Sequence, residues 1–493
     1  MSMAAHLPAL QVVLPLLSAP LAVLLRHGGL AFIVVTAGAW AAFAAAVGLW
    51  LQVGEVGVVS YHIGNWAPPW GIEYRVDRLA SLVLLLVSGT AAIVLPWSRT
   101  SIEREIPADL HYLYYAMFGL CLAGLLGITI TGDAFNVFVF LEISSLATYV
   151  LIALGRDRRA LAASYRYLIM GTIGATFFVI GIGFLYLMTG TLNLVDMAER
   201  LRAVESSRPV LAALAFITVG VSLKLALFPL HQWLPNAYTH APSAVTAFLA
   251  ATATKVSVYV LIRFWFSVFG ESLVFHKLPL PQIMLLLSLA AMFAASFTAI
   301  FQDNLKRLFA YSSIGQIGYI TLGLSFDSVS GLTASIVHLF NHGVTKAAIF
   351  LLIGGIVAVS PGPTFDKLSG LAKRMPLTCF GIVVAGLSLI GVPGTAGFVS
   401  KWTLIVAALE KEQFWLVGAI LLSSLLAVAY VWRFVEVAYF RPAPEGSAKQ
   451  EAPLALLIPA WALVIATIWF GLDTSFTVGT AAEAAQQLVK VGK

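Results

Sequence analysis

Apolar stretches of about 20 residues recur from one end of this 493-residue chain to the other. A helix rises about 1.5 Å per residue, so each stretch is long enough to cross the roughly 30 Å of hydrocarbon in a bilayer. Hydrophobic residues make up 60% of the chain and charged residues only 11%, against roughly 45–50% and 25% in a soluble domain. The pattern therefore predicts an all-α polytopic membrane protein.

We count about fourteen transmembrane helices. Their approximate limits are 8–25, 29–53, 79–97, 111–130, 134–154, 161–188, 209–228, 241–264, 279–301, 305–324, 331–359, 376–408, 415–439 and 453–471. Every connection is short, the longest being residues 54–78, so no room remains for a soluble domain with its own core. Function is therefore expected within the bilayer.

Basic residues are divided unequally between the loops. If the spans alternate, the odd-numbered loops carry fourteen Lys and Arg residues and the even-numbered loops carry eight. Basic loops stay in the cytoplasm, so we expect a multi-pass protein of the cell's inner membrane with both termini on the outer side. Because the basic residues are scattered, the net charge of +6 does not indicate nucleic-acid binding.

Three ionisable residues are predicted to lie deep in the apolar spans. Lys255 is near the middle of AFLAATATKVSVYVLI, and Lys401 follows about 25 predominantly apolar residues. Glu142, in FNVFVFLEISSLATYVLI, is the only carboxylate that we place deep in a span. A charge at the bilayer centre costs about 2.5–3.5 kcal/mol on insertion scales and is functional by default. Removal from water favours the neutral amine, so these lysines are candidate proton carriers that a nearby glutamate controls.

Two spans are predicted to be broken beside a lysine. Lys224 is followed by Pro229, and the twelfth span carries Gly391, Pro393 and Gly394 shortly before its own lysine. Proline removes a backbone donor, and broken helices place free carbonyls and helix ends at mid-membrane, where transporters bind ions. Two such spans separated by five helices are expected from an inverted repeat of five-helix units.

This repeat defines the domain organisation that we predict. Residues 1–105 form helices 1–3, residues 106–270 form the first repeat (helices 4–8), and residues 271–440 form the second repeat (helices 9–13). Residues 441–493 form helix 14 and a tail. The two halves show no convincing residue-level alignment, so the repeat is a hypothesis.

Histidines supply further titratable groups. His338, His342 and Lys346 recur every four residues, so one helix face carries all three and could relay protons between the lysines. His231 and His240 flank the broken seventh span and are expected near the outer surface. Cys121 and Cys379 lie in apolar runs without metal-ligand spacing, so we expect no metal site and no cofactor.

Each of these residues also has a plainer interpretation. Lys224, Lys255 and Lys401 could each be bound to a loop carbonyl for packing alone. Glu142 could form a purely structural ion pair, Lys346 could extend to the membrane surface, and the histidines could be satisfied core residues. The sequence leaves these alternatives open.

The assembled motifs resemble a known family, the antiporter-like membrane subunits of Mrp-type multisubunit Na⁺/H⁺ antiporters, respiratory complex I and membrane-bound hydrogenases. The resemblance covers about residues 70–440, and its motifs are FNVFVFLE (135–142), LKLALFPLHQWLPNAYTHAPSAV (223–245), YSSIGQIGY (311–319) and HLFNHGVTK (338–346). By length and number of spans, the chain looks most similar to the D subunit of Mrp antiporters.

The resemblance implies a polar axis along the membrane midplane. The residues that match it here are Glu142, Lys224, Lys255, His338 and Lys401. We expect a proton to enter toward Lys224 or Lys255, to pass through His338 and water to Lys401, and to leave on the other side, with Glu142 gating the first lysine.

The expected function is that of the proton-translocating subunit of a Na⁺/H⁺ antiporter rather than of an enzyme. Its partners would be other membrane subunits, with protons and Na⁺ as the transported ions. The first alternative is a proton-pumping membrane subunit of a complex I-like or hydrogenase respiratory complex, in which other subunits do the redox chemistry. The second is a membrane scaffold that transports nothing.

Overall fold

The computed structural model describes residues 3–360, 362–443 and 449–491, and these fold into helices and one two-stranded hairpin. The first helices are α1 (Leu7–Leu25), α2 (Gly28–Val56), α3 (Arg78–Glu105), α4 (His111–Ile130), α5 (Ala134–Ala153), α6 (Arg159–Thr189), α7 (Leu194–Leu201), α8 (Arg208–Leu225), α9 (Trp233–His240), α10 (Ser243–Ala251) and α11 (Ala253–Ile262). The remaining helices are α12 (Gly270–Ser272), α13 (Leu280–Ala290), α14 (Ser296–Ile300), α15 (Leu305–Leu324), α16 (Val329–Val359), α17 (Leu371–Arg374), α18 (Pro376–Ile390), α19 (Ala396–Glu410), α20 (Phe414–Val435), α21 (Leu454–Leu472) and α22 (Thr480–Val491).

Twelve helical segments of the described chain are long and apolar enough to cross a membrane, which confirms the polytopic all-α fold. Two of the fourteen predicted spans are not among the twelve. Span 305–324 is the single helix α15, whose Lys, Arg, Gln and Ser residues make it less apolar. Span 376–408 is divided into α18 and α19. Other helices enclose α15 almost completely, so it can be less apolar than a helix that faces lipid.

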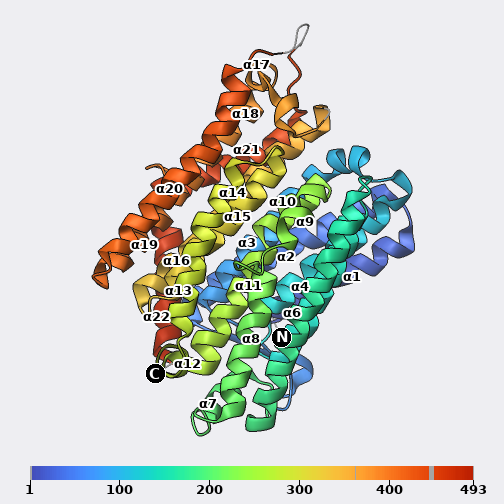
Figure 1. Cartoon of the computed structure of the whole chain (residues 1–493). Helices are drawn as coiled ribbons and strands as arrows, with labels where there is room; N and C mark the ends of the chain where they lie inside the picture. Colours follow the sequence, from blue (N-terminus) through green and yellow to red (C-terminus); the bar gives the residue numbers. More distant parts are fainter. Residues whose placement is uncertain (1–2, 361, 444–448, 492–493) are drawn as a thin grey trace.

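Both described ends of the chain lie at the same end of the helix bundle. There β1 (Val59–His62) pairs antiparallel with β2 (Glu73–Val76), His6 contacts Tyr61 of β1, and Glu483 of α22 pairs with Arg78. We call this end the hairpin face. Helix α3 begins here and ends 28 residues later at Glu105, a rise of roughly 42 Å, so the opposite end is called the Glu105 face. The hairpin face is the lower end in Figure 1, where α7, α12 and the C-terminus lie.

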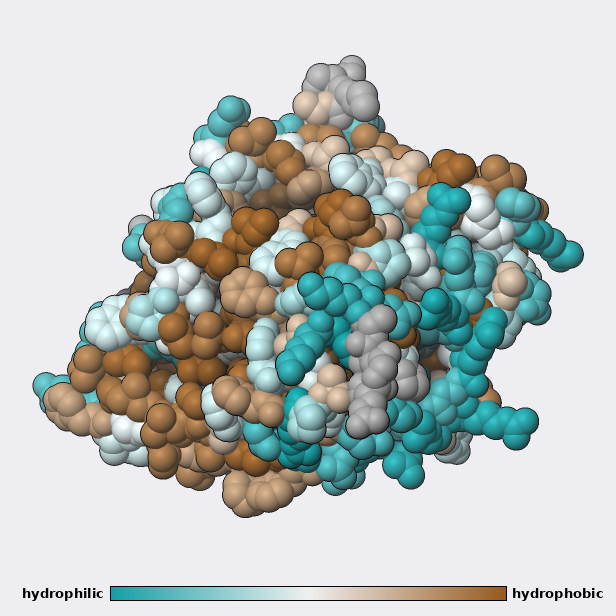
Figure 2. Space-filling view, turned by 90° about the horizontal axis from the view of Figure 1, so that it is seen from above, coloured by the Kyte–Doolittle hydropathy of each residue, from teal (hydrophilic) through white to brown (hydrophobic). Residues whose placement is uncertain are grey.

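Helix α16 forms the centre of the bundle. It packs against α3, α10, α15, α18, α19, α21 and α22, and nearly all of its 31 residues are buried. By contrast, α1, α2, α6, α20 and α21 are buried over little more than a third of their length or less, and their outer faces are apolar. Figure 2 looks down on the bundle from above and shows hydrophobic residues over much of its rim, with hydrophilic residues gathered on one part of the surface. Polar side chains on α16 are therefore shielded from lipid by a ring of helices.

Two interruptions of the backbone lie beside lysines, one directly after Lys224 and one shortly before Lys401. Helix α8 ends at Leu225, Ala226 is left-handed, and α9 begins only at Trp233. Helix α18 ends at Ile390, Gly391 has φ 93°, and α19 begins at Ala396. A positive φ favours glycine and ends a helix. The predicted inverted repeat and the domain limits drawn from it remain predictions.

Candidate functional site

Lys224 and Glu142 form an ion pair inside the bundle. Lys224 lies at the end of α8, directly before the interruption, and its Nζ is 3.6 Å from Glu142 Oε1 on α5. The ammonium also donates to Ser145 Oγ at 2.7 Å, one turn along α5. The Lys224 side chain is 5% exposed, whereas that of Glu142 is 26% exposed. The pair is therefore asymmetric, with a buried cation and an anion near the bundle surface.

A small cavity lies beside this pair. It has a volume of about 20 Å³ and is lined by Lys224 and by the hydroxyls of Ser144, Ser145, Thr148 and Tyr167, among others. A polar cavity of this size is large enough for one water molecule. The lysine is therefore in contact with a polar space that reaches toward α11.

Lys255 lies on α11, close to a kink that separates α10 from α11 at Thr252. The kink leaves the carbonyl of Ala250 outside the helical hydrogen-bond pattern, and Lys255 Nζ donates to it and to Thr254 Oγ1 at 3.3 Å. No carboxylate of the described residues lies within ion-pair distance of this amine. Lys255 is thus a buried cation held by oxygen dipoles alone.

His338 and His342 stack on one face of α16, as the four-residue spacing predicted. Their ring centroids are 5.8 Å apart and the rings are nearly parallel. His338 Nδ1 is 2.7 Å from Ser400 Oγ, while both ring nitrogens of His342 are buried without a protein partner. Buried polar atoms of this kind are normally satisfied by ordered water. The histidines therefore mark a polar stretch of α16 beside Ser400 of α19.

Lys346 lies one turn beyond His342 and is completely buried. Its amine donates to Phe309 O at 2.8 Å and to Ser312 Oγ on α15, and it lies over the rings of Phe309 and Phe350. The alternative that it extends to the membrane surface is therefore wrong, because α15 covers it.

Lys401 on α19 is held by three oxygen atoms and one aromatic ring. Its Nζ donates to Leu389 O at 2.8 Å, to Ile390 O at 3.0 Å and to Ser424 Oγ at 3.0 Å, and it lies 4.4 Å from the ring centroid of Tyr319. The two carbonyls end α18, so they carry the negative end of its dipole. Among the described residues no carboxylate pairs with this lysine.

Sequence reasoning missed the residues that hold Lys224 and Lys401 in place. Ser145, Tyr319 and Ser424 come from helices distant in sequence, and no motif spacing relates them to Lys224 or Lys401. The one available signal was that Tyr319 ends the motif YSSIGQIGY.

The two remaining histidines lie outside this group of contacts. His231 stacks on Phe228 in the interruption after α8. His240 ends α9 at the Glu105 face, where its Nδ1 is 3.2 Å from Asp157 Oδ2. That face also carries Arg156, Arg158 and Arg159, which the basic-residue count assigns to the cytoplasm, so the expected position of His240 near the outer surface is inconsistent with that count.

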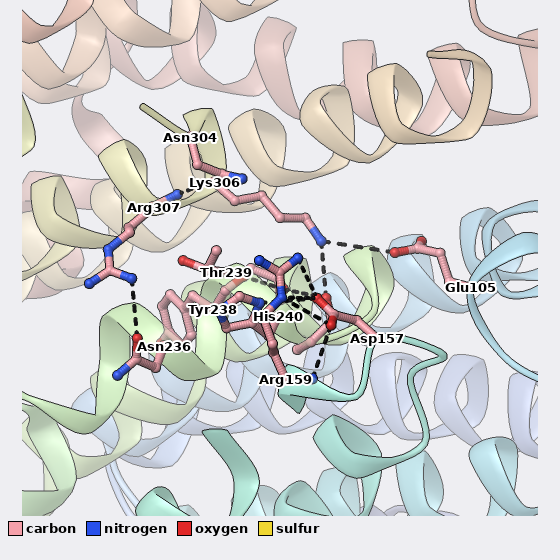
Figure 3. Close-up of polar contacts among 12 residues, drawn as sticks. Glu105, Asp157, Arg159, Asn236, Tyr238, Thr239, His240, Asn304, Lys306 and Arg307 are labelled. Carbon is pink, nitrogen blue, oxygen red and sulfur yellow. Dashed lines mark hydrogen bonds and ion pairs between the residues drawn. The ribbon is translucent and has the colours of Figure 1, made fainter. Parts of the chain in front are cut away.

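A polar cluster at the Glu105 face joins α3, α10 and α15, and Figure 3 shows its Glu105 and Lys306. Glu105 Oε2 accepts from the backbone N–H of Ser243 at 2.9 Å and from its hydroxyl at 3.0 Å, and lies 3.9 Å from Lys306 Nζ. Lys306 also donates to Ala241 O at 3.0 Å. Glu105 thus ties the end of α3 to the start of α10 and of α15.

Next to it, Asp157 accepts hydrogen bonds from Arg159 and His240 (Figure 3). Burial alone would raise the pKa of Asp157, but the hydrogen bonds from Arg159 and His240 outweigh it and the pKa lies below its usual value. Burial also lowers the pKa of His240, and the neighbouring carboxylate offsets this only in part. At neutral pH the pair is therefore a carboxylate beside a neutral imidazole.

Replacing Glu105 by alanine is expected to destabilise the junction of α3, α10 and α15. The change removes the acceptor of the Ser243 N–H at the start of α10 and leaves Lys306 with only Ala241 O as its hydrogen-bond acceptor, which costs about 1–3 kcal/mol. Thermal unfolding in detergent should show a lower melting temperature for Glu105→Ala. Glu103→Ala is the matched control, because Glu103 lies on the same helix end and is exposed. Equal melting temperatures for both variants would contradict this role.

A larger cavity opens toward the hairpin face. It has a volume of about 530 Å³ and lies between α5, α7, α11 and α22, with Arg75, Asp77 and Arg263 among its lining residues. Asp77 pairs with Arg263. Ile128 lines both this cavity and the small cavity beside Lys224. The two cavities therefore share Ile128 as a lining residue, and the larger one opens toward the hairpin face.

Comparison with known proteins identifies relatives that extend over most of the chain. The family model described as "NADH:quinone oxidoreductase/Mrp antiporter, TM" matches residues 131–427. The chain is 40% identical to NADH-quinone oxidoreductase subunit N of Desulforudis audaxviator, over 95% of this chain and 96% of that protein. It is 28% identical to the D subunit of the Na⁺/H⁺ antiporter of Alkalihalophilus pseudofirmus, over 89% and 88%. A chain of the Mrp complex from a Dietzia species superimposes with a TM-score of 0.89 at 27% identity, over 99% of this chain and 98% of that chain.

Proposed function

Because this chain belongs to the NADH:quinone oxidoreductase/Mrp antiporter transmembrane family, we propose that it is the proton-translocating subunit of a multisubunit Na⁺/H⁺ antiporter. The observation that carries this proposal is that, besides Lys306 at the Glu105 face, four lysines are buried in the bundle: Lys224, Lys255, Lys346 and Lys401. Of these four, only Lys224 has a carboxylate partner among the described residues. Such cations are costly in a membrane and mark ion pathways.

The pathway runs through Glu142, Lys224, Lys255, His338 and Lys401. Glu142 stabilises the charged form of Lys224, so their separation releases a proton from the lysine. The proton passes by way of the hydroxyls and water of α5 and α11 to Lys255, then past the histidines of α16 to Lys401. His342 and Lys346 assist on the same helix, and His231 and His240 serve the ends of the route.

The two cavities support access to Lys224 from the hairpin face. Ile128 borders both cavities, and a file of water molecules past this side chain would connect the larger cavity with the lysine. A path that can close is required of an antiporter, because a permanently open path would dissipate the ion gradient.

The partners follow from the relatives. The relative from Alkalihalophilus pseudofirmus belongs by name to a Na⁺/H⁺ antiporter, and the matched structure is an Mrp complex. We therefore place this chain beside other membrane subunits in the cell's inner membrane, with the hairpin face outside. The 40% identity to an NADH-quinone oxidoreductase subunit favours a second candidate, a membrane subunit whose proton movement is driven by redox chemistry in its partners.

Proton flux in inverted membrane vesicles tests the proposal. We expect each of three variants, Lys224→Ala, Lys255→Ala and Glu142→Gln, to lower Na⁺-dependent proton flux by about tenfold or more. The first two remove a proton carrier, and the third removes the carboxylate that stabilises the charged form of Lys224. Lys277→Ala is the control, since this lysine is partly exposed and pairs with Glu205 at the surface. Normal flux with normal assembly in all three variants would leave a non-transporting scaffold as the remaining interpretation.

A further inference from the structure

Two of the oxygen atoms that accept hydrogen bonds from Lys401 are carbonyl oxygens of the last residues of α18, and the helix itself provides no donor for them. The N–H of Gly391 turns back to Leu387 O and Ser388 O, so the carbonyls of Leu389 and Ile390 have no helical partner. Both point at the Lys401 amine instead. The end of α18 is therefore a preformed acceptor site for one cation.

Further oxygen atoms belong to side chains of α15 and α20, two helices that contact this site. Gln316 on α15 donates its Nε2 to Leu389 O at 3.3 Å, and its Oε1 is buried without a partner. The hydroxyl of Tyr430 on α20 is likewise buried without a partner, and Ser424 of the same helix contacts Lys401. The surroundings are thus rich in neutral oxygen ligands and, within the described chain, lack a carboxylate at ion-pair distance.

We propose that the oxygen site formed by Leu389 O, Ile390 O, Ser424 Oγ and Gln316 Oε1 binds a monovalent metal cation in exchange for the protonated amine of Lys401. Lys401–NH₃⁺ and Na⁺ carry the same charge and require the same acceptors, so they are alternative occupants. In the exchange the N–H bond breaks, the proton passes to water, and the neutral amine gives up its place to Na⁺. Net charge is conserved, and no other reactant is needed.

The choice of a monovalent cation follows from the ligands. Carbonyl and hydroxyl dipoles can replace the hydration shell of a singly charged ion, and free carbonyls at the ends of broken helices bind Na⁺ in transporters. Divalent ions are normally bound with carboxylates, and within the described chain none lies at ion-pair distance here. The inference rests on the proposed antiport and adds to it the place where the metal ion and the proton compete.

Direct binding of ²²Na⁺ to the intact complex tests this site without relying on transport. Lys401→Met removes the competing amine and is expected to bind about one additional Na⁺ per chain at neutral pH, whereas the wild type gains this ion only at alkaline pH. Adding Gln316→Ala to Lys401→Met should weaken this binding by about tenfold. Lys255→Met is the matched control. In the wild type the amine of Lys255 contacts other oxygen atoms than that of Lys401, so the Lys255→Met variant should bind no additional Na⁺.

The outcomes separate this inference from the proposed function. Additional Na⁺ in Lys401→Met that weakens with Gln316→Ala supports the site. Equal Na⁺ binding in the wild type, Lys401→Met and the double variant overturns it, even if Lys401→Met loses proton flux and so supports the proposed pathway. Should Lys401→Met fail to assemble, the wild type and Gln316→Ala are compared at alkaline pH, and equal Na⁺ affinity there would equally overturn the site.

Discussion

Gly397→Val is expected to remove most of the folded chain from the membrane and nearly all proton flux with it. A Cβ atom at residue 397 would lie 1.7 Å from Ser388 O, far inside van der Waals contact. The clash is with backbone, so no side-chain rotation relieves it. The two halves of the interrupted span would have to separate, at a cost above the roughly 1–3 kcal/mol of ordinary overpacking.

Separation of these helices would also dismantle the Lys401 site. Gly397 N–H donates to Ser388 Oγ at 3.0 Å, and the two carbonyls that hold Lys401 follow directly on Ser388. The yield of monodisperse protein after detergent extraction and its melting temperature measure the effect. Gly418→Val on α20 is the matched control, because a Cβ there meets nothing within 4 Å. A Gly397→Val protein as stable as Gly418→Val would show that α18 and α19 do not depend on this contact.

The sequence predicted the helices well because hydrocarbon forces backbone hydrogen bonds to be satisfied within each segment. A stretch of apolar residues therefore predicts a helix with little competition from other structures. The helix ends at Leu225 and Ile390 lie near local backbone features that the sequence shows, Pro229 shortly after the first and Gly391 directly after the second. Span 376–408 was predicted as one element because hydropathy does not distinguish a continuous helix from two helices in line.

The environment of each buried lysine was not predictable to the same extent. Composition indicated that Lys401 is buried, but its contact with Tyr319 joins α19 to α15 across 82 positions in sequence. Such contacts depend on how helices pack, which a single sequence does not encode in any regular spacing. The same limit explains why Glu105 was not singled out, because its partners Ser243 and Lys306 belong to other helices.

The pairing of Glu142 with Lys224 admits both a structural and a transport role, and a double-mutant cycle distinguishes them. Glu142→Gln alone leaves the ammonium of Lys224 with Ser145 as its remaining hydrogen-bond partner in the site. Breaking a buried pair by removing one partner costs about 3–5 kcal/mol, whereas replacing both by uncharged residues is often neutral. We therefore expect Glu142→Gln to be less stable than the double variant Glu142→Gln/Lys224→Met.

Proton flux should not follow stability in this cycle. The double variant recovers the melting temperature but has no amine to carry a proton, so its flux is expected to stay about tenfold or more below that of the wild type. A purely structural pair predicts the opposite, namely that flux returns together with stability. Thermal unfolding and vesicle flux measured on the wild type, Glu142→Gln, Lys224→Met and the double variant decide between the two, because only a transported proton requires the lysine itself.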